Sequence, residues 1–394
     1  MMRELELYIH IPFCIKKCLY CDFLSASAEP SVRDRYMNRL TDEIRAYAPD
    51  FRDCRVSSIY IGGGTPSVLE PEQIEKLMDA LLGHFSVTEN AEISMECNPG
   101  TLSGEKAAAM RRSGINRISL GLQSADDDEL NSLGRIHTFA EFEQSFAIAR
   151  EAEFSNINVD IMSGLPGQCV KSWEKTLRST ADLHPEHISA YSLMIEEGTP
   201  FFSRFHEDEL ARERGDRPEF LPSEEDDRLM YELTGELLNA YGYQRYEISN
   251  YALPGYECRH NIGYWTGKEY LGLGVGASSL IGNVRFRNTE IFENYMMPSG
   301  NMVSGAIKPF VRHEEERRGR KEEMEEFMFL GLRMTRGISR QDFRERFGVM
   351  PEDVYGDVLK GLENEGLLSF SEGRIFLTQK GVDVSNMVFM RFLL

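Results

Sequence analysis

The chain has 394 residues, of which 41% are hydrophobic and 27% are charged, and its formal net charge at pH 7 is −20. This length exceeds what one compact core usually reaches, so we expect one large domain and one small domain. The acidic balance disfavours binding to nucleic acid or to an anionic membrane through an overall basic surface. The sequence has no apolar run long enough for a transmembrane helix and no signal-peptide pattern. An odd number of mostly isolated cysteines is typical of the reducing cytoplasm, where we expect the protein to reside.

The first 193 residues alternate strand-like and helix-like segments. Apolar strands are predicted at 5–11, 56–61, 91–96, 117–122, 157–162 and 187–193. Helices are predicted between them at 31–47, 71–84, 102–113, 139–152 and 173–183. Six β/α repeats predict an α/β fold in which a parallel sheet curves into a partial (β/α)6 barrel. In barrels of this kind the active site lies at the carboxyl ends of the strands.

The second half of the chain has a different composition. The charge-dense stretch 205–228 is expected to be a solvated loop or short helices, followed by a helix at 227–241 and a Gly- and Tyr-rich stretch at 243–281. Beyond residue 302 a charge run precedes three predicted helices and a hairpin, at 327–334, 339–347, 351–365 and 367–378. That order predicts a small winged-helix-like α+β module. We therefore expect domains at 1–300 and 301–394, and the acidic module is expected to pack or bind a partner rather than DNA.

Three cysteines lie close together after the first predicted strand. Cys14, Cys18 and Cys21 have the spacing C-x3-C-x2-C. Thiolates are the usual ligands of iron–sulfur clusters, and three of them on a [4Fe-4S] cube leave one iron open for chemistry. A structural zinc site would need a fourth ligand, for which His10 is the nearby candidate, and the three-residue gap is unusual for zinc. The other cysteines are expected to be buried small hydrophobic residues: Cys54, Cys97, Cys169 and Cys258.

This spacing, with Tyr20 directly before the third cysteine, resembles the radical S-adenosylmethionine (SAM) superfamily. The resemblance implies that the amino and carboxylate groups of SAM bind the open iron. It also implies that the reduced cluster cleaves SAM to a 5′-deoxyadenosyl radical, with the electron coming from a donor such as flavodoxin or ferredoxin. Tyr20 would then lie near the adenine.

A run of glycines, Gly62-Gly63-Gly64-Thr65-Pro66, ends the second predicted strand. Glycines allow backbone to approach a ligand closely, although a tight turn alone would also use them. In the resembling superfamily this segment contacts the methionine moiety of SAM. The resemblance therefore assigns Gly63, Gly64 and Thr65 to SAM binding.

Polar residues follow several other strands. Glu96 and Gln123 end the third and fourth strands, Asp160 lies in the fifth, and Arg135 offers a planar donor fork for a carboxylate. Each of them alone could be an ordinary structural residue. Together with Tyr8 on the first strand, they supply what a zwitterion with a ribose needs, so we expect them to bind SAM.

The strings YIHIPFC, IGGGTPS, ISLGLQS and D-x-x-x-GLPGQ resemble the oxygen-independent coproporphyrinogen III oxidase (HemN-like) group. The oxidase carries a further cysteine two places after the third and a long N-terminal extension. Here Phe23 stands at that place, and 13 residues precede Cys14. Both departures resemble the heme-chaperone branch, the HemW-like proteins, which implies heme binding and delivery to acceptor haemoproteins such as respiratory ones.

His260 begins a second motif, H-N-I-G-Y-W, which HemW-like members share. Histidine is a common axial ligand of heme iron, and aromatic side chains give a flat porphyrin an apolar surface. We therefore expect His260 to bind heme within an extension at about 200–300. The alternative is an ordinary buried histidine.

The sequence thus predicts a radical-SAM heme chaperone that binds a [4Fe-4S] cluster, SAM and heme. The first alternative is an oxygen-independent coproporphyrinogen III dehydrogenase, which converts propionates to vinyl groups by oxidative decarboxylation. The second is a regulatory or scaffold protein whose C-terminal module binds a partner or nucleic acid, and the net charge of −20 argues against nucleic acid.

Overall fold

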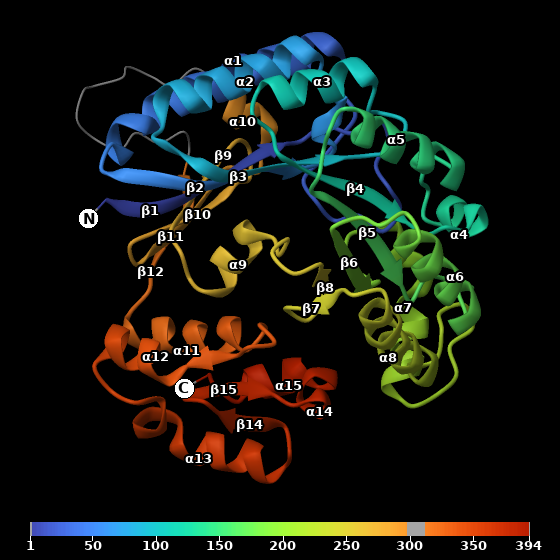
Figure 1. Cartoon of the computed structure of the whole chain (residues 1–394), viewed down its shortest axis with the longest axis vertical. Coiled ribbons are helices and arrows are strands. Elements are labelled where there is room, and N and C mark those ends of the chain that lie inside the picture. The colour runs from blue at the N-terminus through green and yellow to red at the C-terminus, as the bar shows by residue number, and fades with distance from the viewer. Residues whose placement is uncertain (1, 298–311, 394) are drawn as a thin grey trace.

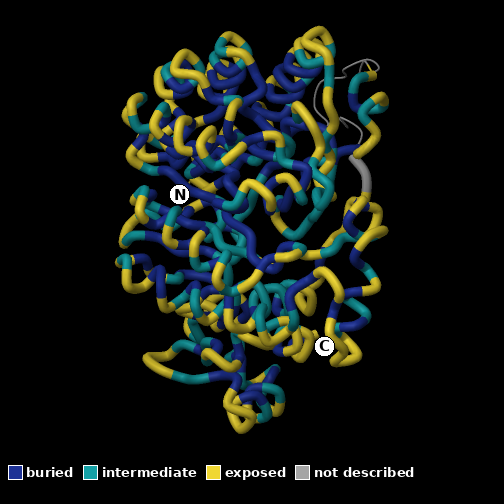
Figure 2. The backbone as a smooth tube through the Cα atoms, turned by 90° about the vertical axis from the view of Figure 1, so that its right-hand side faces the viewer, coloured by how far each residue is buried: buried dark blue, intermediate teal, exposed yellow. Residues whose placement is uncertain are grey.

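The computed structural model describes residues 2–297 and 312–393. One large sheet of twelve strands curves through the molecule, and helices cover its convex side (Figure 1). The strand order is β12-β11-β10-β9-β1-β2-β3-β4-β5-β6-β8-β7. A small module at the C-terminal end lies across the open, concave side of this sheet. Figure 2 shows that buried backbone concentrates in the strands and the inner helix faces, and that exposed backbone concentrates in the turns.

The six predicted parallel strands are confirmed. They are β1 (Arg3–Ile11), β2 (Cys54–Gly63), β3 (Val87–Cys97), β4 (Arg117–Gln123), β5 (Ile157–Ser163) and β6 (His187–Ser192), each paired in parallel with the next. Successive side chains of a strand point to opposite faces. In β1, Leu5, Leu7 and Ile9 are fully buried in the main hydrophobic core, whereas Tyr8 stacks on Tyr60 of β2 on the other face. The concave face is therefore lined with polar and aromatic side chains.

The predicted helices of the barrel are also present; α2 has the predicted bounds, and the ends of the others are shifted by a few residues. They are α1 (Pro30–Tyr47), α2 (Pro71–His84), α3 (Gly104–Arg112), α5 (Phe139–Glu151) and α6 (Val170–Ala181), with a short α4 (Asp127–Ser132). Helix α2 begins with Pro71 directly after a capping box between Glu70 and Gln73. Its apolar side chains Ile74 and Leu77 are buried in the core between the helices and the sheet.

The sheet extends beyond the predicted six strands at both edges. Strand β9 (Tyr270–Leu273) pairs in parallel with the free edge of β1, and it is followed by antiparallel strands β10 (Ser278–Ile281), β11 (Val284–Asn288) and β12 (Arg312–Arg317). At the other edge lie β8 (Asn250–Ala252) and β7 (Gln244–Arg245). The prediction of a six-stranded sheet was therefore incomplete. The added strands are short, which weakens any periodic pattern in the sequence.

The charge-dense stretch is more regular than predicted. It begins with α7 (Pro200–Glu213), capped by Thr199, and leads into α8 (Glu224–Ala240), capped by Ser223. Phe201 and Phe205 of α7 are buried in one cluster with Met162, and that apolar face holds the helix on the barrel.

Helix α9 (Arg259–Trp265) lies inside the concave side of the sheet (Figure 1). The Glu92 carboxylate of β3 accepts the backbone N–H groups of Arg259 (3.0 Å) and His260 (3.1 Å) at the start of this helix. A Cβ on Gly263 would lie only 2.1 Å from the Glu6 carboxylate of β1. The helix therefore approaches the strands more closely than any larger residue would allow. The short α10 (Phe292–Met296) follows β11.

The C-terminal module has its own buried core, which includes Met328, Phe343 and Tyr355. Its elements are α11 (Arg320–Gly331), β13 (Ile338–Ser339), α12 (Arg340–Phe347), α13 (Pro351–Asn364), β14 (Leu368–Ser371), β15 (Arg374–Leu377), α14 (Gln379–Asp383) and α15 (Ser385–Met390). The strands pair antiparallel in the order β13-β15-β14. This confirms the winged-helix-like α+β module, although α11 begins earlier than predicted. The predicted domain boundary at 300 lies outside the described residues. Within 2–297 and 312–393, no helix has the length and apolar character that crossing a membrane requires.

Candidate functional site

Cys14, Cys18 and Cys21 lie in the loop that follows β1, at the carboxyl end of the strand. All three are free thiols of intermediate burial. Backbone hydrogen bonds fix the loop at its base and near its middle, because Cys14 N–H donates to Ala26 O and Leu19 N–H donates to Leu133 O, each at 3.0 Å. The loop is therefore held against the barrel while its thiols stay reachable.

Two of the three sulfurs accept a hydrogen bond from a neighbouring polar group. Thr65 Oγ1 donates to Cys14 Sγ at 3.5 Å, and Arg135 Nη1 donates to Cys18 Sγ at 3.6 Å. Burial raises the pKa of the Cys21 thiol. In the described ranges, no group of His, Cys, Asp and Glu converges on one metal ion, and each thiolate of an iron–sulfur cube binds a different iron. Three thiols, two of which have hydrogen-bond donors behind them, therefore fit such a cluster.

The glycines at the end of β2 pack closely on β1 and on the loop that follows it. Gly63 has φ +114°, and a Cβ there would lie 2.5 Å from the imidazole of His10. A Cβ on Gly64 would lie 2.6 Å from Phe13 O, which accepts the N–H of Thr65 at 2.7 Å. The glycines therefore allow the backbone of β2 to lie very close to the cysteine loop.

Glu96 lies at the centre of the polar concave face. Its carboxylate accepts the Tyr60 hydroxyl at 2.9 Å and the Gly63 N–H at 3.0 Å. Burial, and then the nearby charge of Asp160, raise the pKa of Glu96 to about 7. Asp160 itself accepts the Ser119 hydroxyl at 2.7 Å. A carboxyl group in this setting changes charge near neutral pH, which is common at functional sites.

Arg135 connects the cysteine loop to the strands. Besides Cys18 Sγ, its guanidinium donates to Asn98 Oδ1 at 2.9 Å and to Gly121 O at 2.5 Å. Burial raises the pKa of Tyr20, and the nearby positive charge of Arg135 opposes this rise. Arg135 and Tyr20 therefore lie together beside Cys18, as the prediction of a shared site requires.

Gln123 holds an unusual backbone conformation at the end of β4. Its φ is +73°, and its Oε1 accepts the Tyr191 hydroxyl at 2.9 Å. A residue other than glycine in the left-handed backbone region costs free energy, and such positions cluster at functional sites. The structure thus puts Gln123 at the predicted edge of the sheet, where its side chain is engaged with β6.

A cavity of about 610 Å³ opens beside the cysteine loop, and we call it the barrel cavity. Three of the predicted SAM residues line it: Tyr8, Gly63 and Glu96. Tyr264 and Trp265 of α9 form another part of its wall. Its size is typical of a cavity for a small ligand or cofactor. Thr65, Arg135 and Cys18 line a smaller pocket.

His260 lies within the barrel and is only 1% exposed. Its Nδ1 is 2.8 Å from Ser58 Oγ, its Nε2 is 3.0 Å from Tyr264 Oη, and its ring stacks on Tyr60. Burial and the positive charge of Arg117 lower the pKa of His260 to about 3. Both ring nitrogens are thus engaged in this structure. Heme ligation by His260 stays a prediction, and it would require one of these hydrogen bonds to be released.

Three residues to which the sequence analysis gave no role in SAM binding connect the predicted ones: His10, Tyr60 and Asn98. Asn98 Nδ2 donates to Thr65 Oγ1 at 2.8 Å, and His10 lies 3.0 Å from Tyr8 Oη and 2.9 Å from Leu24 O. The period-2 alternation of β1 could have indicated His10, since Tyr8 is two residues earlier. No local pattern marks Tyr60.

The four remaining cysteines follow the prediction with one exception. Cys54, Cys97 and Cys258 are buried, as predicted. Cys169 is exposed, so its prediction as a buried residue was wrong. It is the N-cap residue of α6, a position at the surface of the barrel where a small polarizable side chain is tolerated.

Comparison with known proteins places this geometry in a family. The radical SAM superfamily matches residues 8–180, and the HemN C-terminal domain matches residues 320–384. The heme chaperone HemW of Bacillus subtilis is 37% identical over 98% of this chain and 98% of that protein. HemW of Escherichia coli is 39% identical over 74% of this chain and 73% of that protein.

Among solved structures, the chain is similar to coproporphyrinogen III oxidase (HemN) from Escherichia coli, described as a radical SAM enzyme. The TM-score is 0.82 at 25% identity, over 99% of this chain and 90% of that one. Fold, motifs and near full-length identity agree: the chain belongs to the radical SAM superfamily and, within it, to the family that includes the HemW proteins.

Proposed function

We propose that this protein is a radical-SAM heme chaperone, which binds a [4Fe-4S] cluster, SAM and heme and delivers heme to acceptor haemoproteins. The observation that carries the proposal is the 37% identity with a heme chaperone over 98% of both chains. Identity that spans barrel, extension and C-terminal module supports a shared function more strongly than a shared barrel alone.

In this proposal Cys14, Cys18 and Cys21 hold the cluster, which supplies an electron to SAM when both are bound and a donor such as flavodoxin or ferredoxin has reduced it. Arg135 and Thr65 donate hydrogen bonds to two of the thiols. Such donors orient metal ligands and tune the metal that they hold.

The barrel cavity is the proposed SAM site. Asp22, Glu96 and Glu290 line it, and Arg285 is the cation among its lining residues. SAM carries a positive sulfonium and a positive ammonium against one carboxylate, so an acidic cavity favours it. Glu96, Gly63 and Tyr8 would contact SAM there. Tyr20, Gly64, Thr65, Gln123, Arg135 and Asp160 would complete the site from the surrounding strand ends.

The second candidate is an oxygen-independent coproporphyrinogen III dehydrogenase, and the similarity to HemN over 99% of the chain favours it. Phe23 argues against it. This residue stands at the place of the oxidase's further cysteine, is 63% exposed, and has no group that can act as a thiol does. The HemW relatives therefore support the chaperone as the first proposal.

Transfer of heme tests the proposal. The purified chain, reconstituted anaerobically with iron and sulfide and loaded with one equivalent of hemin, would be mixed with an apo-haemoprotein. We expect the acceptor's heme spectrum to form faster than it forms when an equal amount of hemin on serum albumin is supplied. Transfer no faster than from albumin would contradict delivery by this chain.

A further inference from the structure

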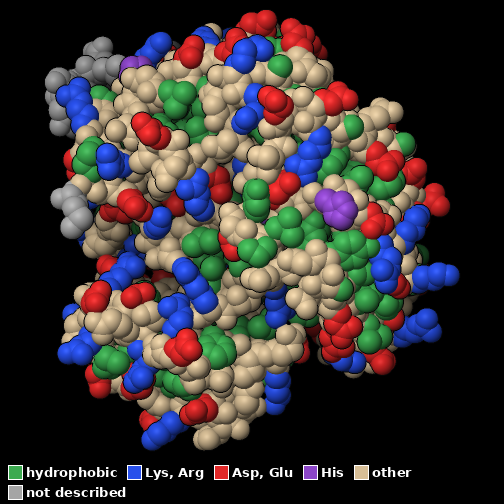
Figure 3. All heavy atoms as spheres, viewed as in Figure 1, with side chains coloured by type: hydrophobic (Ala, Val, Ile, Leu, Met, Phe, Trp, Pro, Cys, Tyr) green, Lys and Arg blue, Asp and Glu red, His purple; other side chains and the backbone are tan. Residues whose placement is uncertain are grey.

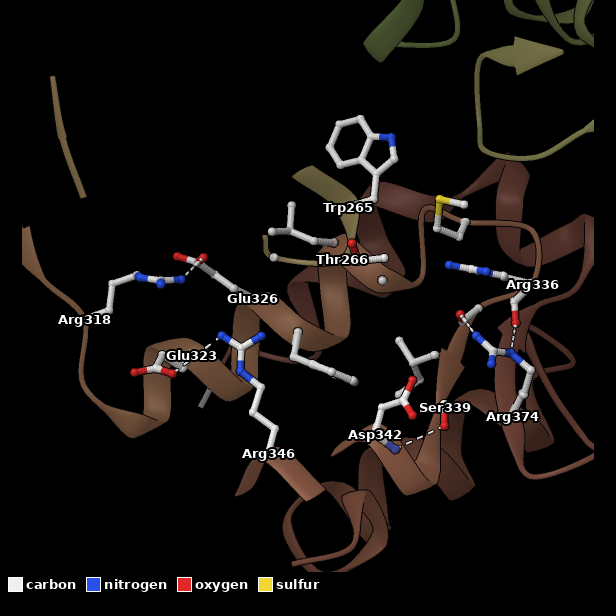
Figure 4. A pocket seen from close by; sticks show the side chains of 17 residues that line it. Trp265, Thr266, Arg318, Glu323, Glu326, Arg336, Ser339, Asp342, Arg346 and Arg374 are labelled. Carbon is white, nitrogen blue, oxygen red and sulfur yellow. Dashed lines mark hydrogen bonds and ion pairs between the residues drawn. The ribbon is translucent and has the colours of Figure 1, made fainter. Parts of the chain in front are cut away.

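A second pocket, of about 210 Å³, lies between the end of α9 and the C-terminal module, and we call it the junction pocket (Figure 4). Trp265 of α9 forms one wall, and Phe327, Leu330 and Met334 supply further apolar surface. Arg336, Arg374 and Asp342 lie on one side, opposite Arg318, Glu323 and Glu326. Figure 3 shows blue Lys and Arg side chains along the seam between the barrel and the module on this face.

The arginines of the junction pocket are not all neutralised. Arg318 Nη1 pairs with Glu326 at 2.5 Å, and Arg346 pairs with Glu323 at 3.6 Å. The Arg374 guanidinium instead donates to the backbone oxygens of Arg336 and Gly337, each at 2.7 Å.

Neither Arg336 nor Arg374 forms an ion pair with a carboxylate in the part of the chain that the structure describes. Arg336 and Arg374 lie close together, because the Arg374 guanidinium donates to the backbone oxygen of Arg336. Burial, and then the charge of Arg336, lower the pKa of Arg374. Both arginines therefore line one side of the junction pocket, with Asp342 as the nearby anion.

The two cavities differ in the sign of their charge. The barrel cavity is lined by three carboxylates and one arginine, whereas the junction pocket is lined by four arginines and three carboxylates. In a chain of net charge −20 this makes the junction pocket unusual. Heme carries two propionates on a flat apolar body, so its charge matches the junction pocket better than the barrel cavity.

The indole of Trp265 is suited to a flat ligand. The Arg333 guanidinium stacks on it at 4.4 Å from the ring centroid, which restricts the ring. Its Nε1 is buried and has no hydrogen-bond partner among the described residues. A donor left without a partner is costly unless a ligand or water satisfies it. His260, Glu92 and Gly263 fix α9 in the barrel, and thereby hold Trp265 in this place.

We propose that heme binds at the junction pocket by its propionate edge, with Trp265 against the macrocycle and with Arg336 and Arg374 binding the propionates. This proposal rests on the proposed heme-chaperone function and names the site for its cargo. A pocket of 210 Å³ is smaller than those that enclose a whole cofactor, so part of the ring stays outside. Such a partly exposed position suits a ligand that is passed to another protein.

The test is a hemin titration of the full chain, followed in the visible spectrum, with one variant that removes a cation and one that removes an anion. Arg336→Gln should weaken hemin binding about tenfold, and Asp342→Asn should strengthen it severalfold. Arg344→Gln on the exposed side of α12 is the matched control and should bind as the wild type does. Hemin dimethyl ester, which has no free propionates, should bind the wild type and Arg336→Gln equally.

The outcomes separate the two proposals. Wild-type hemin binding that neither Arg336→Gln nor Asp342→Asn changes would overturn the junction pocket and leave the chaperone function standing. Equal losses in Arg336→Gln and Arg344→Gln would also overturn it, because they would indicate a general charge effect. No hemin binding by the wild type would contradict the proposed function itself.

Discussion

Gly63→Ala tests whether the cysteine loop depends on the close packing of β2. The new Cβ would lie 2.5 Å from the imidazole of His10, at a backbone φ of +114° that side-chain residues rarely adopt. The backbone conformation alone costs about 1–3 kcal/mol. His10 must also move, and it then loses its hydrogen bonds to Tyr8 and to Leu24 O in the cysteine loop, at about 0.5–1.5 kcal/mol each. Together these effects predict that the free energy of unfolding falls by about 2–6 kcal/mol.

Urea unfolding of the protein without its cluster measures the loss of stability. Iron bound per chain after anaerobic reconstitution measures whether the cysteine loop still holds the cluster. We expect a lower unfolding midpoint and less bound iron, because Leu24 O moves with His10. Gly83→Ala in α2 is the control, since nothing lies within 4 Å of its new Cβ. It should stabilise the helix by about 0.5–1 kcal/mol and leave iron binding unchanged. If Gly63→Ala matched the wild type in both stability and iron content, the packing argument would be wrong.

Three further predictions concern single polar groups. Arg135→Lys removes the planar fork that reaches Cys18, Asn98 and Gly121, so SAM affinity measured by calorimetry on the reconstituted protein should fall at least tenfold, and an unchanged affinity would remove Arg135 from the site. His260→Ala leaves the hydroxyls of Ser58 and Tyr264 without their buried partner, so urea unfolding should show a loss of about 2–3 kcal/mol. Shifted bands of bound hemin in this variant would support His260 as an iron ligand, and unchanged bands would remove it from the heme site. Burial raises the pKa of Glu6 from 4.5 to about 8, so the native state binds this proton more tightly than the unfolded chain, and the stability it contributes is present below pH 4.5 and is lost as pH rises through 8. At 1.36 kcal/mol per pKa unit, this pH-dependent contribution to stability is at most ~5 kcal/mol. The unfolding midpoint of Glu6→Gln should therefore fall less between pH 5 and 8 than that of the wild type. Parallel curves for the two proteins would refute a raised pKa of Glu6.

The parts of the fold that sequence reasoning predicted are those with strong local patterns. Helix α2 matches its predicted range because Pro71 and the capping box mark its start and because Ile74 and Leu77 repeat at helical spacing. The parallel strands were predicted because each is apolar and ends in a loop with glycine or polar residues. The same regularity put the cysteines, Gly63 and Glu96 at one edge of the sheet.

What the sequence did not reveal depends on contacts between distant segments. Strand β9 has four residues, and Gly272 within it allows Ser278 O to approach within 2.1 Å of where a Cβ would be. His260 bonds to Ser58, which is 202 residues away along the chain, so no local pattern distinguishes a buried anchor from a heme ligand. The junction pocket likewise joins Trp265 to a module that begins more than fifty residues later.

The measurement that tests the central claim most directly is a hemin titration of the anaerobically reconstituted chain, with a coproporphyrinogen III assay on the same preparation. We predict a stoichiometric shift of the Soret band and no conversion of coproporphyrinogen in the presence of SAM and a reductant. Conversion of coproporphyrinogen with SAM cleavage and no Soret shift would contradict the account, and would mean that the barrel is a decarboxylase that works without the further cysteine at position 23.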